Sequence, residues 1–434
     1  MKREYLKQVI IDQKETYLDN PIIRRDFELE ENINYCFVGI RRTGKSYMLY
    51  QQIQNLLTSG KRLNDILYVN FEDERLLEVT SEDLNVILEI GLELAGEGEK
   101  PFIFLDEIQR VDRWENFVRR LADMKYRVSI TGSNSKMLSR EIASTLGGRF
   151  MPVQIFPYSF PEYLHALGKE KDFLQVISTA DKANLFQIYE QYVKYGAFPE
   201  LVDIKNKRNY LSGIYQTIYI GDVLARNNVT NDFAIRLILK KIAESVMKPI
   251  SFSRLANILN SAGAGIGKQT VINYVGYMKE AYLLFSIQNY AAKLVEKETA
   301  PKYYFMDTGL LGLLVMNSET AQLENLVAIE LCRRYGTDNV YFFESNIEVD
   351  FYLPEQNLAI QVSYSILDEV TTRERELNAL EKLRNYFPDA NCLLITNSEE
   401  TEIEYHGIRI DVIPAWKWLL KADGDGFAVS LYET

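Results

Sequence analysis

The sequence predicts an α/β protein that begins with a parallel sheet covered by helices on both faces. Between residues 35 and 155, short apolar runs alternate with amphipathic segments, a pattern typical of strands joined by helical crossovers. Strand-like runs return after residue 301 and indicate a second α/β region. With 434 residues, of which 47% are hydrophobic, the chain is long enough for two or three domains of about 150 residues each.

The first segment, residues 1–30, predicts a helix because apolar side chains recur at three- and four-residue spacing. Residues 31–158 then predict the parallel-sheet core. Its expected elements are, in order, strand Tyr35–Gly39, helix Lys45–Thr58, strand Ile66–Phe71, helix Leu84–Leu94, and the strands Phe102–Leu105, Val128–Thr131 and Phe150–Ile155.

Three further segments follow. Residues 159–230 have a mostly helical pattern and are expected to form a helical lid. Residues 231–300 predict short helices followed by a strand, Leu283–Gln288. Residues 301–434 predict an α/β domain, whose charged helix is Arg373–Tyr386 and whose strands are Tyr303–Met306, Val340–Phe343, Val349–Leu353, Leu358–Val362 and Cys392–Thr396.

Charge and cysteine usage limit the functional class. The net charge of −12 excludes nucleic-acid binding through overall attraction, so any DNA contact needs a local basic patch. Cys36, Cys332 and Cys392 lack the spacing of metal ligands, so we expect buried thiols in a reducing compartment. No apolar run approaches the roughly 20 residues that span a bilayer, and the amino terminus lacks a signal peptide's apolar core. We therefore expect a cytoplasmic protein without a membrane partner.

The most informative motif is Gly39–Ser46, which reads G-x-x-x-x-G-K-S between an apolar strand and an amphipathic helix. Glycines at both ends let backbone N–H groups approach phosphates, and the following helix points its amino terminus at the same anion. A chance glycine loop is the alternative, but it does not require this context. The motif predicts a site for ATP with Mg²⁺. The residues expected to contact the nucleotide are Gly39, Arg42, Thr43, Gly44, Lys45, Ser46 and Tyr47.

A second motif, Phe102–Glu107, is an apolar strand that ends in two carboxylates. Lys45 is expected to reach the β- and γ-phosphates, and Ser46 and Asp106 to serve Mg²⁺. Glu107 would deprotonate the attacking water, which makes the site a hydrolase. The alternative is a buried strand ending in solvated acids, and the pairing with the glycine loop favours the functional interpretation.

Two further segments are candidates for the same site. The strand ending in Thr131–Asn134 offers a polar side chain to the γ-phosphate or the water, and both Ser133 and Asn134 qualify. Arg149, after two glycines, can supply an arginine finger to its own site or to a neighbouring subunit. A small polar turn and a surface arginine are the respective alternatives. Arg41, in the glycine loop, is a weaker candidate for nucleotide or subunit contact.

Together these residues resemble the prokaryotic ATP-binding proteins that join an AAA-type core to a C-terminal domain of unknown function. The matching segments cover most of the chain: Val38–Ser46, Leu105–Gln109, Thr131–Ser133, Gly148–Arg149, Pro157–Glu162, Tyr195–Glu200, Pro301–Leu310 and Glu348–Phe351. The resemblance implies an AAA-type P-loop NTPase core, a winged-helix segment and a C-terminal domain related in fold to restriction-type nucleases. It names no biological role, because that of the family is poorly defined.

Residues 235–290 carry seven basic and two acidic residues, against the negative charge of the whole chain. The segment predicts two helices, Ser253–Leu259 and Lys268–Lys279, with glycines between them. The second helix begins with residue types that read bases in the major groove: Lys268, Gln269, Thr270 and Asn273. DNA is therefore one candidate partner. The alternative is a winged-helix unit used for packing or subunit contact.

A nuclease site in the C-terminal domain would need a helix carboxylate, a strand aspartate and a Glu-x-Lys pair. We expect Glu330 and Asp350 in the first two places. Gln361 and Ser363 stand where the glutamate and lysine should be. A neutral glutamine is a poor ligand for Mg²⁺, and a serine cannot supply the positive charge of the lysine. The sequence therefore predicts the fold without the nuclease activity.

The function predicted is Mg²⁺-dependent ATP hydrolysis, with the nucleotide state coupled to the winged-helix and C-terminal domains. One alternative is a nucleotide-gated DNA-binding or protein-interaction switch with little turnover. Others are a structural protein stabilised by ATP, which has no need of Glu107, and a kinase, for which no substrate motif is present. A protein client and further copies of the chain are candidate partners that the sequence does not identify.

Overall fold

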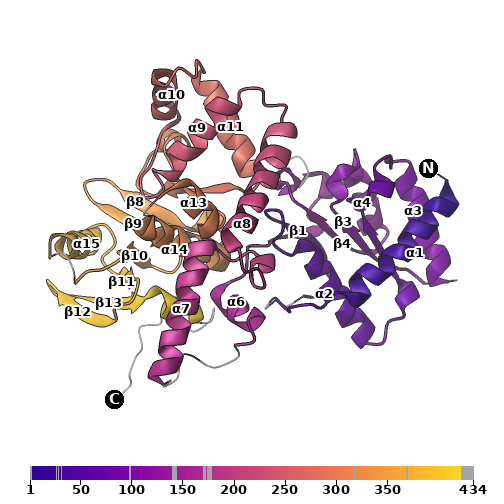
Figure 1. Cartoon of the computed structure of the whole chain (residues 1–434), viewed down its shortest axis with the longest axis horizontal. Helices are drawn as coiled ribbons and strands as arrows, with labels where there is room; N and C mark the ends of the chain where they lie inside the picture. The colour runs from indigo at the N-terminus through magenta and orange to yellow at the C-terminus, as the bar shows by residue number, and fades with distance from the viewer. Residues whose placement is uncertain are drawn as a thin grey trace. The chain divides into compact units, whose positions relative to one another are not determined.

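A computed structural model describes residues 2–25, 27, 29–30, 32–96, 99–138, 144–169, 173, 178–316, 318–367 and 370–421 (Figure 1). The chain forms two compact units. The amino-terminal unit comprises residues 1–156 with Glu280–Tyr282, and the carboxy-terminal unit comprises residues 157–279 and 283–434. Each unit is built around its own sheet.

The amino-terminal unit contains a five-stranded sheet in the order β2-β3-β4-β1-β5. All neighbouring strands are parallel, which confirms the predicted α/β fold with a parallel sheet. The strands are β1 (Asn34–Val38), β2 (Ile66–Asn70), β3 (Phe102–Asp106), β4 (Arg127–Gly132) and β5 (Phe150–Gln154).

The strand register decides where polar side chains can meet. Val38 pairs with Gly132, and Leu105 pairs with Ile130 on the other side of β4. The carboxyl ends of β1, β3 and β4 therefore lie at the same edge of the sheet, and the segments that follow them project from that edge. This edge holds the glycine loop and both carboxylates of the predicted nucleotide site.

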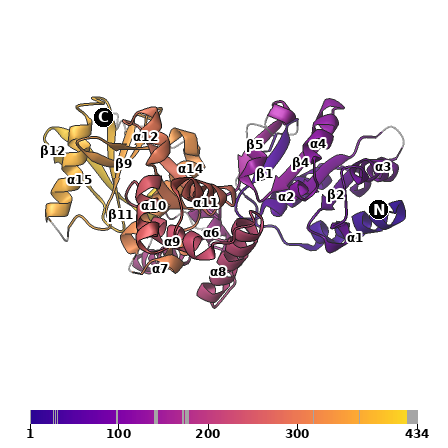
Figure 2. The ribbon, with the colours of Figure 1, turned by 90° about the horizontal axis from the view of Figure 1, so that it is seen from above.

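The helices of this unit contact the strands: α1 (Arg3–Asp19) lies on β2, α2 (Lys45–Thr58) on β1, β3 and β4, α3 (Asp83–Ala95) on β2, and α4 (Trp114–Asp123) on β4 (Figure 2). The helix predicted for residues 1–30 was too long. It ends at Asp19 because Pro21 drives Asn20 into extended backbone, with φ −77° and ψ 123°. Beyond the proline, Ile22, Phe27 and Leu29 lie outside any helix and pack against the core.

The carboxy-terminal unit contains a mixed eight-stranded sheet in the order β12-β13-β11-β10-β9-β8-β6-β7. Its strands are β6 (Leu284–Asn289), β7 (Lys302–Phe305), β8 (Tyr341–Glu344), β9 (Glu348–Leu353), β10 (Leu358–Val362), β11 (Asn391–Thr396), β12 (Thr401–Tyr405) and β13 (Ile408–Pro414). The hairpin of β12 and β13 was not predicted. The strand expected at the end of residues 231–300 is β6, and it pairs with β7 and β8.

The helical pattern predicted for residues 159–230 is confirmed for the described residues. They form α6 (Phe160–Ala166), α7 (Thr179–Tyr195), α8 (Lys207–Gln216) and a π-helical segment (Thr217–Ala225). The later helices are α9 (Asp232–Ala243), α10 (Phe252–Ser261), α11 (Lys268–Glu280), α12 (Leu294–Thr299), α13 (Thr308–Leu314), α14 (Glu319–Tyr335), α15 (Val370–Leu383) and α16 (Ala415–Leu420).

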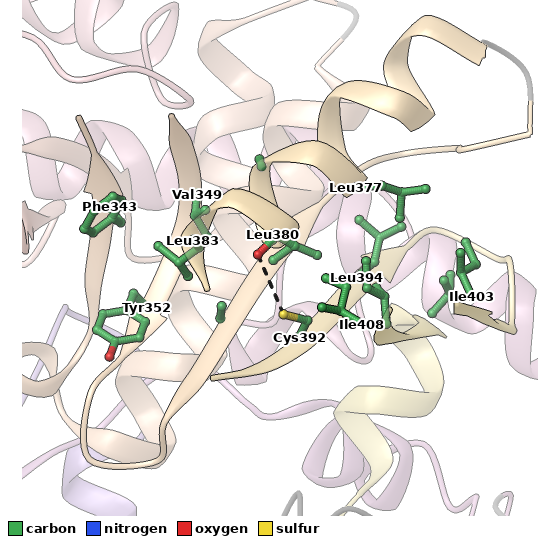
Figure 3. Packing of buried hydrophobic residues seen from close by; sticks show 14 of the residues in the cluster. Phe343, Val349, Tyr352, Leu377, Leu380, Leu383, Cys392, Leu394, Ile403 and Ile408 are labelled. Atoms are coloured by element: carbon green, nitrogen blue, oxygen red, sulfur yellow. Dashed lines mark hydrogen bonds between the residues drawn. The ribbon is translucent and has the colours of Figure 1, made fainter. Parts of the chain in front are cut away.

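Helix α15 covers one face of the eight-stranded sheet (Figure 3). Its residues Leu377, Leu380 and Leu383 pack among buried strand residues such as Val349 and Leu394. Burial of each such side chain contributes about 2 kcal/mol through the hydrophobic effect. All three cysteines are buried and unpaired, as predicted. Among the described helices, none has the length and apolar composition that a bilayer crossing requires.

Candidate nucleotide site

The glycine loop joins β1 to α2 through backbone conformations that only glycine adopts without strain. Gly44, with φ 89°, is the residue directly before the first turn of α2. Gly39 has φ 151°, and a Cβ atom there would lie 2.3 Å from the carbonyl oxygen of Ile155. A side chain at Gly39 would collide with the backbone of Ile155, and a side chain at Gly44 would strain the backbone through its positive φ. The loop therefore presents its backbone amides instead of side chains, as a phosphate cradle requires.

Two side chains of the loop fold back onto its own backbone. The Thr43 hydroxyl donates a hydrogen bond of 2.9 Å to the carbonyl oxygen of Ile40. The Lys45 ammonium donates one of 3.1 Å to the same oxygen and lies 3.6 Å from Oε1 of Glu107. Lys45 is 4% exposed, so its charge acts in a largely water-free setting.

Asp106 ends β3 and is almost wholly buried. The Tyr68 hydroxyl donates to its Oδ2 at 2.9 Å, and the Thr131 hydroxyl donates to its Oδ1. The Ser46 hydroxyl also lies near this carboxyl and acts to lower its pKa. Burial, together with the charge of Glu107, raises the pKa of Asp106 above its ordinary value, although all three hydroxyl donors oppose the rise.

Glu107 follows in the left-handed region, with φ 53°, which turns its carboxylate toward the glycine loop. The carboxylate accepts hydrogen bonds from the Ser133 hydroxyl at 3.0 Å, from the Ser133 amide at 3.3 Å and from the Gln109 side chain. Burial alone would raise the pKa of Glu107. The charge of Lys45 and these donors outweigh burial and lower the pKa below its ordinary value.

The structure brings five of the predicted residues together: Lys45, Ser46, Asp106, Glu107 and Ser133. Of the two candidates after β4, Ser133 touches Glu107, whereas Asn134 is the next residue along the chain and half-buried.

The remaining loop residues lie nearer the surface. Arg42 is exposed, with φ 65°, and Arg41 pairs with Glu72 at 3.0 Å. Tyr47, in the first turn of α2, is 41% exposed, and its ring lies 5.2 Å from that of Tyr50 at an angle of 56°.

Arg149 does not join this cluster. It precedes β5, pairs with Asp123 at 2.6 Å, and its carbonyl accepts a hydrogen bond from the side chain of Asn34. Asn34 begins β1, while the glycine loop follows the end of this five-residue strand. At about 3.3 Å per residue, Arg149 and the loop lie at opposite edges of the sheet, roughly 17 Å apart.

The structure adds residues that sequence reasoning missed. Arg25 donates to the Thr43 carbonyl oxygen at 2.6 Å and to the Phe156 carbonyl oxygen at 3.1 Å, so it ties the loop to the end of β5. Tyr68, Thr131 and Gln109 orient the two carboxylates. A polar residue at a strand end was the only available signal, and in the segment Thr131–Asn134 it pointed to Ser133 and Asn134 but not to Thr131. Tyr68 sits inside an apolar run, where a tyrosine suggests core packing.

The site fits a magnesium nucleotide by the chemistry of its donor set. The glycine loop carries the buried Lys45 ammonium, and a hydroxyl and a carboxylate adjoin each other at Ser46 and Asp106. Hard oxygen ligands of this kind suit Mg²⁺, which commonly keeps several waters.

The carboxy-terminal unit holds a second charged cluster, centred on Lys302 of β7. This fully buried ammonium lies 3.3 Å from Asp350, 3.6 Å from Glu324 and 3.2 Å from Glu348. Burial alone would lower the pKa of Lys302, but the three carboxylates raise it. Glu324, Glu348 and Asp350 also line a pocket of about 420 Å³.

The prediction for the helix carboxylate of this cluster was wrong. Glu330 pairs with Arg333 and Arg334 on its own helix, and Glu324 instead lies beside Lys302. Gln361 stands next to Asp350, whose amide donates to it at 3.2 Å, while the Ser363 hydroxyl bonds the carbonyl oxygen of Ser365. Within the described part of the chain, no group of three His, Cys, Asp or Glu residues is arranged to hold a metal.

Comparison with known proteins shows which families and relatives the chain resembles. Residues 32–164 match the family described as "AAA domain", and residues 186–321 match a domain of unknown function (DUF8612). The chain is 34% identical over 436 residues to an uncharacterized protein of Methanocaldococcus jannaschii, with 96% of each chain covered. It is 31% identical to an uncharacterized protein of Haemophilus influenzae, covering 94% of this chain and 98% of that one.

Similar solved structures include a Walker-type ATPase of Pyrococcus abyssi, at a TM-score of 0.38 and 15% identity, covering 72% of this chain and 95% of that one. Another is Cdc6p of Pyrobaculum aerophilum, at a TM-score of 0.27 and 14% identity, covering 75% of this chain and 94% of that one. Both TM-scores are low.

Proposed function

The chain belongs to the same family as the Methanocaldococcus jannaschii and Haemophilus influenzae proteins and carries an AAA-type P-loop ATPase domain, and we propose that it binds ATP with Mg²⁺ and hydrolyses it. The observation that carries the proposal is the position of Glu107. Its buried, ionised carboxylate lies 3.6 Å from the loop lysine and beside the Ser46–Asp106 pair. A site that only stores nucleotide has no use for a base in that position.

The chain's own groups divide the work of hydrolysis. The amides of the loop and the first turn of α2 bind the phosphates, and Lys45 exchanges its bond to the Ile40 carbonyl oxygen for phosphate oxygens. Bound Mg²⁺ would supply charge neutralisation of the phosphates, with Ser46 and Asp106 holding it. Glu107 accepts a proton from the attacking water, and the bonds from Ser133 and Gln109 fix its orientation.

The binding half of this proposal is tested with a fluorescent ATP analogue and the variant Lys45→Ala. We expect the variant to lose at least about a hundredfold in affinity, because it removes the charge that meets the β- and γ-phosphates. Glu78→Gln is the control, since Glu78 is an exposed acid of the same unit. Unchanged affinity in Lys45→Ala would refute the assignment of the site.

A second candidate function is DNA binding by the proposed winged-helix segment. Its support is the start of α11, where Lys268, Gln269 and Asn273 are exposed on one helix that follows α10 after a short connection. The segment 235–290 is also basic, with seven positive and two negative residues. The test is salt-dependent binding of double-stranded DNA by the full chain and by Lys268→Ala/Gln269→Ala. Equal binding by both would remove α11 from the interface.

The carboxy-terminal unit, in this proposal, has a nuclease-like fold without nuclease activity. Support comes from Lys302, whose ammonium fills the centre of the acidic cluster that a divalent cation would need. The proposal also couples nucleotide state to this unit, since the chain passes between the units at Phe156–Pro157 and again between Lys279 and Leu283. Incubation of DNA with the protein and Mg²⁺ or Mn²⁺ should leave the DNA intact. Cleavage that survives purification, and is lost in Asp350→Asn, would contradict this part.

A further inference from the structure

A line of hydroxyl groups runs from helix α2 to the carboxylate at the end of β3. The hydroxyl oxygens of Tyr50 and Tyr68 lie 3.2 Å apart, and the Tyr68 hydroxyl donates to Oδ2 of Asp106 at 2.9 Å. A phenol has one proton to give, and Tyr68 gives it to Asp106. Tyr50 is therefore the donor in the bond between the two tyrosines.

The two tyrosines explain how the second carboxylate oxygen of Asp106 is hydrogen-bonded. Thr131 of β4 holds Oδ1, and Tyr68 of β2 holds Oδ2. Asp106 lies on β3, between these two strands. A carboxylate that accepts hydrogen bonds from both neighbouring strands has little freedom to rotate. Its orientation relative to Ser46 is therefore fixed before any ligand binds.

Core packing is the competing explanation of Tyr68. Its ring lies 5.4 Å from that of Tyr17 and 5.6 Å from that of Tyr50, and it is 2% exposed. A phenylalanine would fill the same space. Packing does not explain why two buried hydroxyls line up on a carboxylate, since each must be desolvated and then satisfied at this place.

Helix α2 ties this line to the glycine loop. Ser46 and Tyr50 are four residues apart and so project from one face of the helix. Ser46 meets Asp106 directly, and Tyr50 meets it through Tyr68. Helix α2 therefore reaches the carboxylate directly at Ser46 and only indirectly, through Tyr68, at Tyr50.

We propose that Tyr68 is a positioning residue for magnesium, holding Asp106 in the orientation in which it and Ser46 receive the nucleotide-bound ion. This inference rests on the proposed function and deepens it. It assigns to Tyr68 the coupling between nucleotide and metal, and to Tyr50 only the support of Tyr68.

The test compares the affinity of a fluorescent ADP analogue in excess Mg²⁺ with its affinity in a chelator, for four proteins: wild type, Tyr68→Phe, Tyr50→Phe and the double variant. Both substitutions keep the ring and remove one buried hydroxyl. We expect Tyr68→Phe to keep the chelator affinity and to lose about tenfold of the enhancement by Mg²⁺, because one bond to a charged group is gone. The double variant, which leaves no orphaned Tyr50 hydroxyl, should match it.

Tyr50→Phe is the matched control, because it leaves the bond between Tyr68 and Asp106 in place. Its enhancement by Mg²⁺ should equal that of the wild type. An enhancement in Tyr68→Phe equal to that of the wild type would overturn the inference. An equal loss in Tyr50→Phe would also overturn it, because that variant keeps the bond between Tyr68 and Asp106. If wild type shows no enhancement by Mg²⁺, the metal-binding part of the proposed function itself fails.

Discussion

Two adjacent carboxylates at the end of β3 experience opposite environments. Burial and the neighbouring charge raise the pKa of Asp106, while Lys45 and the donors around Glu107 lower the pKa of Glu107 below its ordinary value. Environments that separate two acids in this way usually assign them different roles. Here Glu107 is the ionised group that can take a proton, and Asp106 is the one held in place by hydroxyls.

The contact between Ser133 and Glu107 gives the first prediction. Ser133→Ala removes the 3.0 Å bond to the Glu107 carboxylate, so we expect kcat to fall by about tenfold or more while ATP affinity is retained. Asn134→Ala should have the smaller effect on kcat. Steady-state hydrolysis by the two variants decides between the alternatives that the sequence left open. A larger loss in Asn134→Ala would assign the role to that residue instead.

Asp307 in the carboxy-terminal unit gives a prediction on pH. This buried carboxyl accepts bonds from the amides of Ala197, Gly309 and Leu310, yet burial raises its pKa to about 6. A raised carboxyl pKa means that folding favours the protonated form. The corresponding stability is present in acid and is lost as pH rises through about 6.

The measurement is thermal unfolding of wild type and Asp307→Asn, whose side chain does not titrate. The stability of wild type relative to the variant should increase by about 1 kcal/mol between about pH 7 and pH 5. At all pH values the variant should be the less stable, because an amide cannot accept from all three backbone N–H groups as the carboxylate does. A difference that stays constant with pH would show that Asp307 does not titrate in this window.

At the scale of elements, the sequence predicted best where one motif fixes both chemistry and backbone. The G-x-x-x-x-G-K-S spacing placed the loop and helix α2 at the observed residues. It predicted least where a strand lacks a continuous apolar run, even though buried and exposed side chains alternate along it, as in β13. The hairpin of β12 and β13 exposes Thr401, Glu402 and Arg409 and has no long apolar run to indicate a strand.

The position of Arg149 could have been reasoned out from topology. It comes immediately before a strand of a parallel sheet, and the glycine loop comes immediately after one. In a parallel sheet these two places lie at opposite edges. The two preceding glycines suggested a reach to phosphate, whereas strand direction separates Arg149 from the loop of its own chain.

The glycine loop itself is tested by Gly39→Ala. The added Cβ would meet the Ile155 carbonyl oxygen at 2.3 Å, so either β5 or the loop must shift. We expect loss of nucleotide binding and a lower thermal midpoint. Gly60→Ala is the control, because Gly60 also has positive φ, 93°, but nothing lies within 4 Å of its added atom. That variant should cost about 1 kcal/mol and bind nucleotide normally. Normal binding by Gly39→Ala would show that the loop does not need this close approach.

At the scale of the whole molecule, long-range pairing was the part that sequence could not supply. Lys302 lies on β7, whereas Glu324 lies on α14 and Asp350 on β9. Because these elements are far apart in the sequence, local residue spacing could not predict that the three side chains form one cluster. The same holds for Glu324, which lies beside Asp350 in place of the predicted Glu330. Spacing along α14 allowed either, and the ion pairs of Glu330 with Arg333 and Arg334 turn it elsewhere.

Assembly offers a prediction at this scale. Because Arg149 lies away from the loop of its own chain, the proposed finger role requires a second copy. Specific ATPase activity should then rise with protein concentration in wild type and stay low in Arg149→Ala. Arg119→Ala is the control, since Arg119 also neighbours Asp123 and is exposed. Specific activity that does not depend on protein concentration and is unaffected by Arg149→Ala would show that Arg149 is not an arginine finger.

The central claim, that this site hydrolyses ATP through Glu107, is tested most directly by steady-state phosphate release in Mg²⁺ from wild type and Glu107→Gln, with nucleotide affinity measured on the same samples. The account predicts that the variant binds ATP at least as tightly as wild type and loses at least about a hundredfold in turnover, because an amide cannot accept the proton of the attacking water. Turnover in Glu107→Gln equal to that of wild type would contradict it.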